Sequence, residues 1–518
     1  METVQQKVKR PRGVVKAARH SAGEFCRSTS LHGLQYVADT SRPPLERLLW
    51  LLIFLVSTAI VVHFVGKIWD RWQTTPVMVN FDEKTTPIWS IPFPAITICP
   101  DIKVQETTFN YTEMYYKMNK TDEEIDKFNK AQLVCRAMFD FGINTHINED
   151  NGNSSVDGMD EFLEEVSPSQ EDMMLVCSWR GKEDFDCNDF KPIITDDGLC
   201  FTFNMLNSRQ LLRHPNDKPS YQHPNVSHWM FEKGYDDTEN VDVYPKRSMR
   251  PGARGGLSVF LMFDLQDLDS LCNLATQGIK IVVHNPTDFP NIHDNYFRVN
   301  VGNDVVVGIK PRVMTNSETI RSYSPDRRQC YYSSERHLSY FHVYTQSNCE
   351  LECLTNYTQQ SCNCVQFFMP RTEEMSVCGA QNQMCTETAT DSFITDDEGL
   401  ELCDCLPDCY EVKYDVETSQ ANANITKTMG DILTALKQET LFSEQFQVSR
   451  VSFYYKDGQF VSSHRSELYG LLDFLANCGG LLGLCVGFSM LSLVEIVYFF
   501  TVRFISNLRW REKQPKYP

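Results

Sequence analysis

The sequence predicts an integral membrane protein of the α+β class, with two transmembrane helices and one large, disulfide-rich extracellular domain. Three observations lead to this fold class. The 518-residue chain has two long apolar segments, one near each end. Sixteen of its 19 cysteines lie between these segments, and an even number of closely spaced cysteines is typical of an oxidising compartment. Both ends of the chain are basic, although its net charge is −19.

The first apolar segment, residues 48–66, contains 19 residues without a formal charge. As a helix it would be about 29 Å long, which matches a hydrocarbon core of about 30 Å. Residues 1–47 hold nine Lys or Arg against four Asp or Glu, so we expect this side to be cytoplasmic. A cleavable signal peptide fits less well, because the run starts late, is long and lacks a small-x-small cleavage site.

The second apolar segment, residues 468–502, contains Asp473 and Glu495 with 21 uncharged residues between them. In a straight helix the two carboxylates would be about 33 Å apart, near opposite membrane faces. A basic tail, residues 503–518, follows. We therefore expect a plasma-membrane protein with two spans, both termini cytoplasmic, and residues 67–467 outside.

The predicted extracellular domain also contains all six N-glycosylation sequons of the chain. Each sequon alone is a weak signal. The acceptor residues are Asn110, Asn119, Asn153, Asn225, Asn356 and Asn424.

Composition and motifs exclude several other classes of protein. An acidic chain is a poor candidate for binding nucleic acid. A membrane-anchored ectoenzyme is the main alternative from another class, but the sequence contains no HExxH, GxSxG or Walker-type motif. The Cys-x-Cys pairs lack the usual spacing of structural zinc ligands. We therefore expect no enzymatic activity, no metal site and no cofactor.

Small residues are concentrated in the second apolar segment. Gly479, Gly483 and Gly487 recur every four residues, a pattern that lets helices approach closely in lipid and favours self-association. The alternative is that the second segment is a single helix packed on residues 48–66, and that its glycines have no role in self-association. Two charges in one span favour a water-facing path over this alternative. Ala476 and Gly487 lie within about 20° of each other around a helix, so both could belong to one wall of such a path.

The residues of the second segment resemble a known family closely. Gly479 begins the run GGLLGLCVGFS, which ends at Ser489 and is followed by Leu-Val-Glu495. This run is similar to the second transmembrane segment of the degenerin/epithelial sodium channel/acid-sensing ion channel family. Further matches, in the family's order, are His32-Gly33, FPAITIC ending at Cys99, GLCFTFN beginning at Gly198, the Cys349/Cys353 and Cys362/Cys364 pairs, and CDCLPDC ending at Cys409.

Within that family the Gly-Phe-Ser triplet and short tails look most like the arthropod pickpocket branch. A purinergic receptor is the nearest rival channel, but the cysteine spacing and the Phe93–Cys99 motif are not its pattern. The resemblance implies a homotrimer, or a heterotrimer with related subunits. It also implies an extracellular domain shaped as palm, knuckle, β-ball, finger and thumb.

Local sequence patterns support parts of that architecture. Residues 256–264, 280–284 and 447–455 are rich in β-branched residues and alternate in polarity, as palm strands would. Residues 149–172 are acidic and are expected to form a solvated finger loop or short helix.

The cysteine pairing follows only from the resemblance, because sixteen thiols allow many connectivities. It leaves Cys135 and Cys272 as candidates for one further bridge. The implied thumb bridges would make that region a stiff lever that transmits movement to the membrane. The implied pairs are Cys99–Cys200, Cys177–Cys187, Cys330–Cys409, Cys349–Cys405, Cys353–Cys403, Cys362–Cys385 and Cys364–Cys378.

The resemblance also implies a function, a sodium-permeable and amiloride-sensitive cation channel. Gly487, Phe488 and Ser489 would form the selectivity filter through their backbone carbonyls. Asp473 and Glu495 would attract cations at the outer and inner pore mouths. Phe488 is bulkier than the residue the family commonly has there, which weakens the expectation of strict sodium preference and of amiloride block.

Three further residues match gating positions of the family. His32 and Gly33 match a cytoplasmic segment that folds back beneath the pore and influences open probability, although an isolated His-Gly pair would more simply be a turn. Ala476 matches the degenerin position, where a small side chain lets three helices close. The sequence does not identify the stimulus: protons, peptides, small molecules, osmotic change and force all remain open.

Overall fold

The computed structural model of the 518-residue chain describes most of it. The chain forms two compact units. One, here called the helical unit, consists of Met1–Met78, Glu318–Arg328 and Ser466–Pro518, and the other, the sheet unit, consists of Val79–Ser317 and Gln329–Arg465. The described residues are 21–74, 77–136, 156, 158–182, 186–214, 229–230, 232–235, 243–273, 276–293, 295–395, 403–428, 431 and 445–506.

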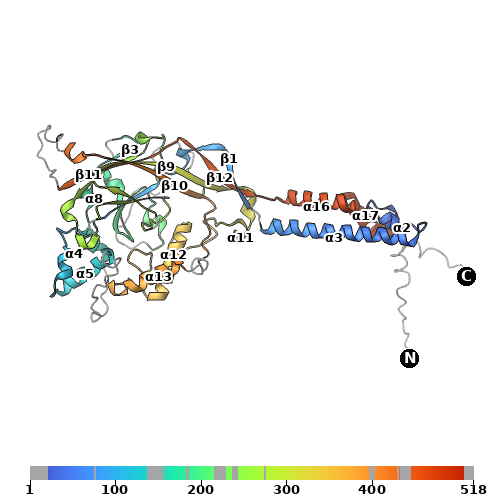
Figure 1. The fold of residues 1–518 in the computed structure, drawn as a ribbon, viewed down its shortest axis with the longest axis horizontal. Coiled ribbons are helices and arrows are strands. Elements are labelled where there is room, and N and C mark those ends of the chain that lie inside the picture. The colour runs from blue at the N-terminus through green and yellow to red at the C-terminus, as the bar shows by residue number, and fades with distance from the viewer. Residues whose placement is uncertain are drawn as a thin grey trace, which may run out of the picture. The chain divides into compact units, whose positions relative to one another are not determined.

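The helical unit is dominated by two apolar helical segments that run beside each other (Figure 1). Of the described helices, α3 alone is long and apolar enough to cross a membrane, whereas α16 and α17 meet that test only as a pair, bent by 69° at the break between them. The elements are α2 (Leu34–Ala38), α3 (Pro44–Thr74), the 3-10 helix η5 (Glu318–Ser322), α11 (Pro325–Arg328), α16 (Leu471–Val486), α17 (Met490–Tyr498) and the π-helix η7 (Phe499–Arg503).

Helix α3 extends beyond the predicted span at both ends. It begins at Pro44, a residue favoured in the first helical position because its fixed φ suits a helix and its missing N–H is not needed there. It continues past Gly66 to Thr74. The 31-residue helix is about 46 Å long, longer than the hydrocarbon core of a membrane.

The sheet unit contains two β-sheets. The seven-stranded sheet has the order β1-β12-β9-β11-β6-β3, with β10 also paired to β9. Its strands are β1 (Val77–Pro87), β3 (Met174–Trp179), β6 (Leu257–Asp264), β9 (Asn303–Asn316), β10 (Glu411–Asn422), β11 (Phe446–Tyr455) and β12 (Gln459–Glu467). The five-stranded sheet has the order β4-β5-β2-β7-β8, with β2 (Ala95–Pro100), β4 (Phe190–Thr195), β5 (Gly198–Phe203), β7 (Gly278–His284) and β8 (Phe297–Asn300).

Helices border these sheets (Figure 1). They are α4 (Tyr111–Tyr116), α5 (Asp122–Val134), α7 (Met159–Val166), α8 (Gln170–Met173), α9 (Ser208–Leu211), α10 (Ser270–Asn273), α12 (Gln346–Cys362) and α13 (Gln383–Thr395). The three segments expected to form palm strands are strands β6, β7 and β11. Only β6 and β11 share the seven-stranded sheet, however, because β7 pairs with β2 and β8 in the five-stranded sheet. The acidic segment 149–172 contributes α7 and the start of α8, whereas residues 149–155 and 157 lie outside the described part.

The core of the sheet unit is held by aromatic side chains. The ring of Phe93 is fully buried and contacts Trp179 at 4.9 Å and Tyr455 at 5.5 Å between centroids. The hydroxyl of Tyr455 donates to the carbonyl of Pro92 at 2.8 Å, so this buried polar group is satisfied. These contacts fix β11, β3 and the segment before β2 against one another.

Eight disulfides cross-link the sheet unit. Five of them lie in or around α12 and α13: two join α12 to residues 403–405, one joins residue 330 to residue 409, and two link the end of α12 and the loop after it to residue 378 and to α13. This small region therefore has little freedom to move internally. The bridges are Cys99–Cys200, Cys135–Cys272, Cys177–Cys187, Cys330–Cys409, Cys349–Cys405, Cys353–Cys403, Cys362–Cys385 and Cys364–Cys378. These are the seven pairs implied by the family resemblance together with the Cys135–Cys272 bridge.

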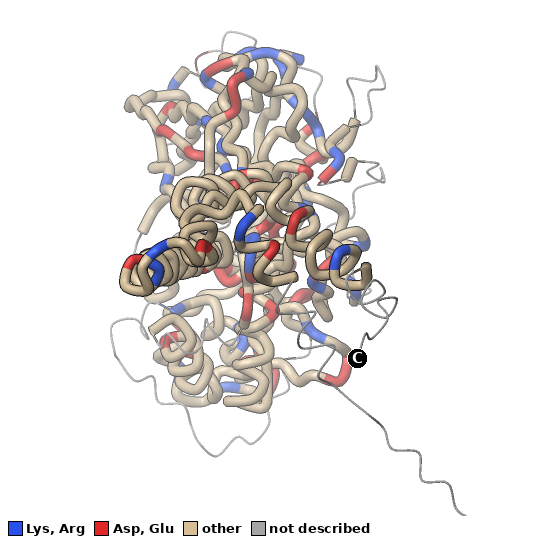
Figure 2. Tube along the Cα trace, turned by 90° about the vertical axis from the view of Figure 1, so that its right-hand side faces the viewer, with Lys and Arg blue, Asp and Glu red and all other residues tan. Residues whose placement is uncertain are grey.

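Charged residues of both signs are interspersed along the described trace (Figure 2). Some form buried clusters: the Asp197 carboxylate accepts from Lys103 at 2.5 Å and from Lys280 at 2.6 Å. Interspersed signs are typical of a soluble surface, not of a nucleic-acid interface.

Two carboxyl groups, the buried Asp408 and the partly buried Asp288, lie beside the start of α12. The backbone N–H of Gln346 donates to Asp408 at 3.0 Å, and the hydroxyl of Thr345, the N-cap residue, hydrogen-bonds Asp288. Burial raises the pKa of Asp288 to about 7, and the nearby Glu411 adds to that shift. Burial also raises the pKa of Asp408 well above its ordinary value, and there the nearby Asp288 carboxyl adds to the shift. Protonated carboxyls are therefore favoured at this position in the folded protein.

These raised pKa values predict that the sheet unit loses stability as the pH rises. A carboxyl that prefers to stay protonated when folded stabilises the fold fully below its unfolded pKa of about 4, and the contribution is lost by about pH 7. In the unmodified protein, ionisation of Asp288 should lower the free energy of unfolding by about 2 kcal/mol between about pH 5 and about pH 7. We expect Asp288→Asn to remove this loss. The measurement is the apparent unfolding temperature of the purified protein at both pH values.

The control for this prediction is Asp391→Asn, which alters an exposed carboxylate on α13. It should leave the pH dependence as it is in the unmodified protein. An identical pH dependence in the Asp288→Asn variant and the unmodified protein would show that Asp288 does not stay protonated in the fold.

Candidate functional site: the interrupted second helix

The second apolar segment is broken at Gly487, Phe488 and Ser489. Helix α16 ends at Val486, and Gly487 adopts a left-handed conformation with φ 72°, which glycine reaches without steric cost. The N–H groups of Gly487 and Phe488 still donate to the carbonyls of Gly483 and Leu482, at 3.0 and 3.2 Å. The C-terminal carbonyls of α16 are thus partly satisfied from within the break.

The far side of the break is capped by two serines. The Ser489 hydroxyl accepts from the N–H of Ser492 at 3.3 Å, and the Ser489 N–H donates to the Ser492 hydroxyl at 3.0 Å. This reciprocal pair starts α17 and satisfies two backbone donors that a helix start leaves free. Ser492 is completely buried.

A segment from the start of the chain fills the space beside the break. The backbone N–H of His32 donates to the carbonyl of Val486, the last residue of α16, at 2.9 Å. The His32 ring lies against Gly487, where an added Cβ would come within 2.7 Å of it. Gly33 has φ 84° and caps α2, so the chain turns sharply immediately after contacting the break.

Polar contacts from Glu495 and Ser492 hold this N-terminal segment along α17. The Glu495 carboxylate accepts from the Ser30 N–H at 3.1 Å and from the Thr29 hydroxyl at 3.3 Å. The hydroxyls of Ser30 and Ser492 are 2.7 Å apart. The sequence placed Glu495 at the inner pore mouth, and the structure shows its carboxylate anchoring residues 29–30.

The segment also follows the last turns of the second helix. Arg503 pairs with Glu24 through two contacts of 3.1 and 3.2 Å. The ring of Phe25 packs on Phe499 and Phe500, at 5.8 and 5.6 Å between centroids. Residues 24–32 therefore contact the second helix from Val486 to Arg503.

The other predicted residues of the second span lie on α16. The Asp473 carboxylate accepts the N–H of Gly470 at 3.1 Å and so caps the helix start. Ala476 is exposed, and a Cβ added to Gly479 or Gly480 would meet no atom within 4 Å. Because α16 and α17 are bent by 69°, Asp473 and Glu495 do not lie at the ends of one straight helix.

The C-terminal end of α3 contacts the segment 318–328 of the same unit. The Arg327 guanidinium lies over the rings of Trp72 and Tyr323, at 4.8 and 4.2 Å from their centroids, and it donates to the Trp72 carbonyl at 3.2 Å. Trp72 stacks on Phe474 in the first turn of α16, at 5.1 Å. The Tyr323 hydroxyl donates to Glu467 at 3.0 Å. Segment 318–328 therefore contacts α3 directly and reaches the chain entering α16.

Four of the six predicted glycosylation sites lie in the described residues. Asn119 is exposed. The side chains of the other three are engaged: Asn110 caps α4, Asn424 accepts the Lys427 N–H at 3.1 Å, and Asn356 accepts from the Tyr340 hydroxyl at 3.2 Å. Asn153 and Asn225 lie outside the described residues.

Comparison with known proteins decides the family. The family described as amiloride-sensitive sodium channel matches residues 25–499. This chain belongs to that family. The match spans the N-terminal segment, both apolar helical segments and the sheet unit. It identifies the chain as an ion-channel protein and not an enzyme.

Individual relatives from the amiloride-sensitive sodium channel family cover nearly the whole chain. Pickpocket protein 28 of Drosophila melanogaster is 29% identical over 94% of this chain and 79% of its own length. Sodium channel protein Nach of the same species is 23% identical over 95% and 89%. Acid-sensing ion channel 1C of Danio rerio is 23% identical over 91% and 82%. The resemblance to this family, and to pickpocket proteins within it, is therefore confirmed.

Several residues of the site were not identified from the sequence. Glu24, Phe25 and Ser30 contact the second helix, but they lie hundreds of residues from their partners and form no local motif. The contact of Arg327 with Trp72 was also missed. Its one sequence signal was Trp69 and Trp72 just beyond the first span, because tryptophan is enriched at membrane interfaces.

The tight contact at Gly487 predicts that Gly487→Ala displaces the N-terminal segment. A Cβ would overlap the His32 ring, and the left-handed conformation costs a non-glycine residue about 1 kcal/mol. We expect Cys26, which is half-buried in this segment, to react faster with a maleimide in Gly487→Ala than in the unmodified protein. Peptide mass mapping separates Cys26 from the free thiols Cys478 and Cys485.

Gly66→Ala is the matched control, because a Cβ at this helical glycine meets nothing within 4 Å. Removing the obstructing ring with His32→Ala should return Cys26 reactivity in the double variant toward that of His32→Ala alone. Equal reactivity in Gly487→Ala and Gly66→Ala would contradict the contact.

Proposed function

We propose that the chain is a subunit of a trimeric cation channel of the plasma membrane, permeable to sodium and sensitive to amiloride. Both apolar segments cross the bilayer, both termini are cytoplasmic, and the sheet unit is extracellular. The partner subunits are copies of this chain or related chains. An extracellular chemical or mechanical stimulus opens the pore.

The observation that carries this proposal is the break at residues 487–489 inside an apolar segment. Within a bilayer, a backbone that leaves the helix is tolerated only where it lines water or is buried in protein. Here the chain's own N-terminal segment covers part of the break. The remaining carbonyls of Gly487, Phe488 and Ser489, contributed by three subunits, supply oxygen ligands to a dehydrated cation.

The glycine-rich face of α16 supports assembly around a central pore. Open space surrounds Gly479 and Gly480 within the chain, and small residues let neighbouring helices pack closely in lipid. The Asp473 carboxylate, near the outer end of this helix, attracts cations. Glu495 contributes negative charge below the filter while anchoring Thr29 and Ser30.

The contacts of segment 318–328 support gating from outside the membrane. This segment leads directly to Cys330, the first cysteine of the disulfide-rich region that includes α12 and α13. In the family's terms we assign the thumb to α12 and α13, the palm to the seven-stranded sheet, the β-ball to the five-stranded sheet and the finger to α4–α8. Through Arg327, a movement at the base of the thumb reaches Trp72 and, by stacking, Phe474.

The experiment that tests the function is expression in oocytes under voltage clamp. External pH, osmolarity and candidate ligands are varied one at a time, with and without amiloride, and with external sodium replaced by a large organic cation. We expect an inward current that depends on sodium. Absence of any such current, with the protein at the cell surface and across all stimuli and related partner subunits, would contradict the proposal.

The filter assignment predicts that Phe488→Ala changes the relative permeability of sodium and potassium. Phe488 occupies the middle position of the break, so a smaller side chain alters the spacing of the surrounding carbonyls. We expect a shifted reversal potential under bi-ionic conditions. Leu55→Ala, on the exposed apolar face of α3, is the control and should leave it unchanged. Identical reversal potentials in both variants and the unmodified channel would rule out this filter.

The gate assignment predicts a standing current from Ala476→Phe. Ala476 is exposed on α16, and we place it where three helices close together. A larger side chain destabilises the closed state more than the open state, because closely packed helices have little spare volume. Unstimulated current normalised to surface expression measures the effect. Leu475→Phe changes the neighbouring face and should give no standing current; equal currents from the two variants would argue against a gate at Ala476.

A further inference from the structure

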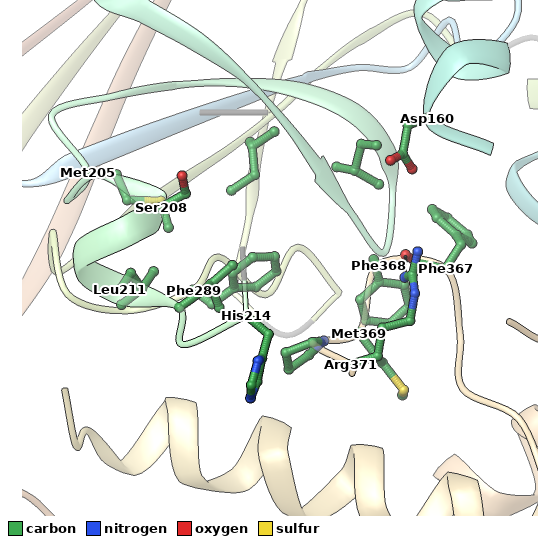
Figure 3. A pocket seen from close by; sticks show the side chains of 14 residues that line it. Asp160, Met205, Ser208, Leu211, His214, Phe289, Phe367, Phe368, Met369 and Arg371 are labelled. Carbon is green, nitrogen blue, oxygen red and sulfur yellow. Dashed lines mark hydrogen bonds between the residues drawn. The ribbon is translucent and has the colours of Figure 1, made fainter. Parts of the chain in front are cut away.

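A cavity of about 90 Å³ lies within the sheet unit. Its lining comes from five parts of the unit: the first turn of α7, the β4 strand, the segment at and around α9, residue 289 after β7, and residues 367–371 between α12 and α13 (Figure 3). The cavity belongs entirely to this unit, and none of its residues takes part in the proposed conduction path.

The walls of the cavity are apolar and close-packed. They include Ile193, Met205, Leu211, Phe289, Phe367 and Met369. Of these, Met205, Leu211 and Met369 are at least 98% buried. Ligand sites in proteins are typically concave and apolar, with a few polar groups that set orientation.

Covalent and backbone links hold the wall formed by residues 367–371 in place. The bridges Cys364–Cys378 and Cys362–Cys385 flank this loop. The Cys378 N–H donates to the Val365 carbonyl at 2.8 Å, and the Arg371 guanidinium donates to the Phe367 carbonyl at 2.8 Å. The cavity is therefore preformed, so a ligand need not order the loop in order to bind.

One charged group at the rim has no partner of its own. Asp160, in the first turn of α7, points toward the cavity (Figure 3). No hydrogen bond or ion pair to its carboxylate occurs among the residues that the structure describes. Arg371 lines the same cavity and donates one guanidinium N–H to the Phe367 carbonyl, and it forms no ion pair with Asp160. A half-buried carboxylate without a counter-ion attracts a cation.

The volume limits what the apolar walls can enclose. A dry cavity of about 150 Å³ holds a benzene ring. A cavity of about 90 Å³ therefore encloses a branched aliphatic group of four or five carbons, and the rest of a ligand remains at the mouth beside Asp160.

We propose that this cavity binds small organic ammonium ions that carry a short branched apolar group. The apolar group lies among Leu211, Phe367 and Met369, and the ammonium hydrogen-bonds the Asp160 carboxylate. This inference goes beyond the proposed channel function and does not depend on it, because it concerns binding and not conduction.

The test uses the purified full-length protein in nanodiscs, with binding of three probes measured by saturation-transfer NMR. The probes share one branched alkyl group: isopentylammonium, neutral isopentanol and anionic isovalerate. Empty nanodiscs correct for partitioning into lipid. We expect saturable binding of isopentylammonium about tenfold tighter than of isopentanol, which corresponds to a single charge-assisted hydrogen bond. Isovalerate should bind more weakly than either.

Three substitutions test whether the probes bind in this cavity. Asp160→Asn should remove the preference for the ammonium while leaving binding of isopentanol unchanged. Glu164→Gln, an exposed carboxylate on the same helix, is the matched control and should keep the preference. Ser208→Leu fills the cavity and should abolish binding of both isopentylammonium and isopentanol.

Four outcomes would overturn the proposal. They are the absence of saturable binding to the unmodified protein, equal affinity for the ammonium and the alcohol, tightest binding of isovalerate, and an unchanged preference in Asp160→Asn. If Ser208→Leu fails to fold, Asp160→Asn still decides the matter, because this substitution lies at the rim. Since no current is measured, failure here is distinct from failure of the channel proposal.

Discussion

The arrangement of the helical unit depends on one constraint: a backbone that leaves the helical conformation in an apolar segment must find partners for its N–H and C=O groups. At the break after Val486, those partners come from Gly483, from the Ser489–Ser492 pair and from the backbone of His32. Glycine at position 487 makes the turn accessible without strain and leaves room for the histidine ring. Together these features stabilise the interruption, because they supply partners for backbone groups that a continuous helix would otherwise satisfy.

This constraint joins the start of the chain to the part of the second helix that we assign to the pore. The histidine that caps the break lies two residues from Ser30, which contacts Glu495. A displacement of the N-terminal segment therefore changes hydrogen bonds on both sides of the break at once. Such coupling means that a change at Thr29 or Ser30, which contact Glu495, can alter the break at residues 487–489 through His32. It also explains why a carboxylate in an apolar helix is tolerated: its charge is satisfied by a backbone N–H and a hydroxyl.

Rigidity in the sheet unit has a different source. Eight disulfides and an aromatic core around Phe93 fix its elements, and the same cross-links that stiffen the region of α12 and α13 keep the cavity beside Phe367 open. A region that cannot deform internally moves as a rigid body. A force or a bound ligand therefore displaces the segments at its two ends. Segment 318–328, which leads into that region, packs on Trp72 at the end of the first apolar helix through Arg327.

The sequence by itself determined the class of the protein, because apolar length, glycine spacing and charge asymmetry are local properties that follow from the residues in one stretch of chain. It also predicted three of the strands, and the family resemblance implied the disulfide pairs and drew attention to residues 487–489. Only the tertiary structure showed that Glu495 binds Thr29 and Ser30, that His32 closes the break, and that Asp160 faces an apolar cavity. Contacts between residues hundreds of positions apart leave no periodic or local pattern, since they arise from the folding of distant segments against one another.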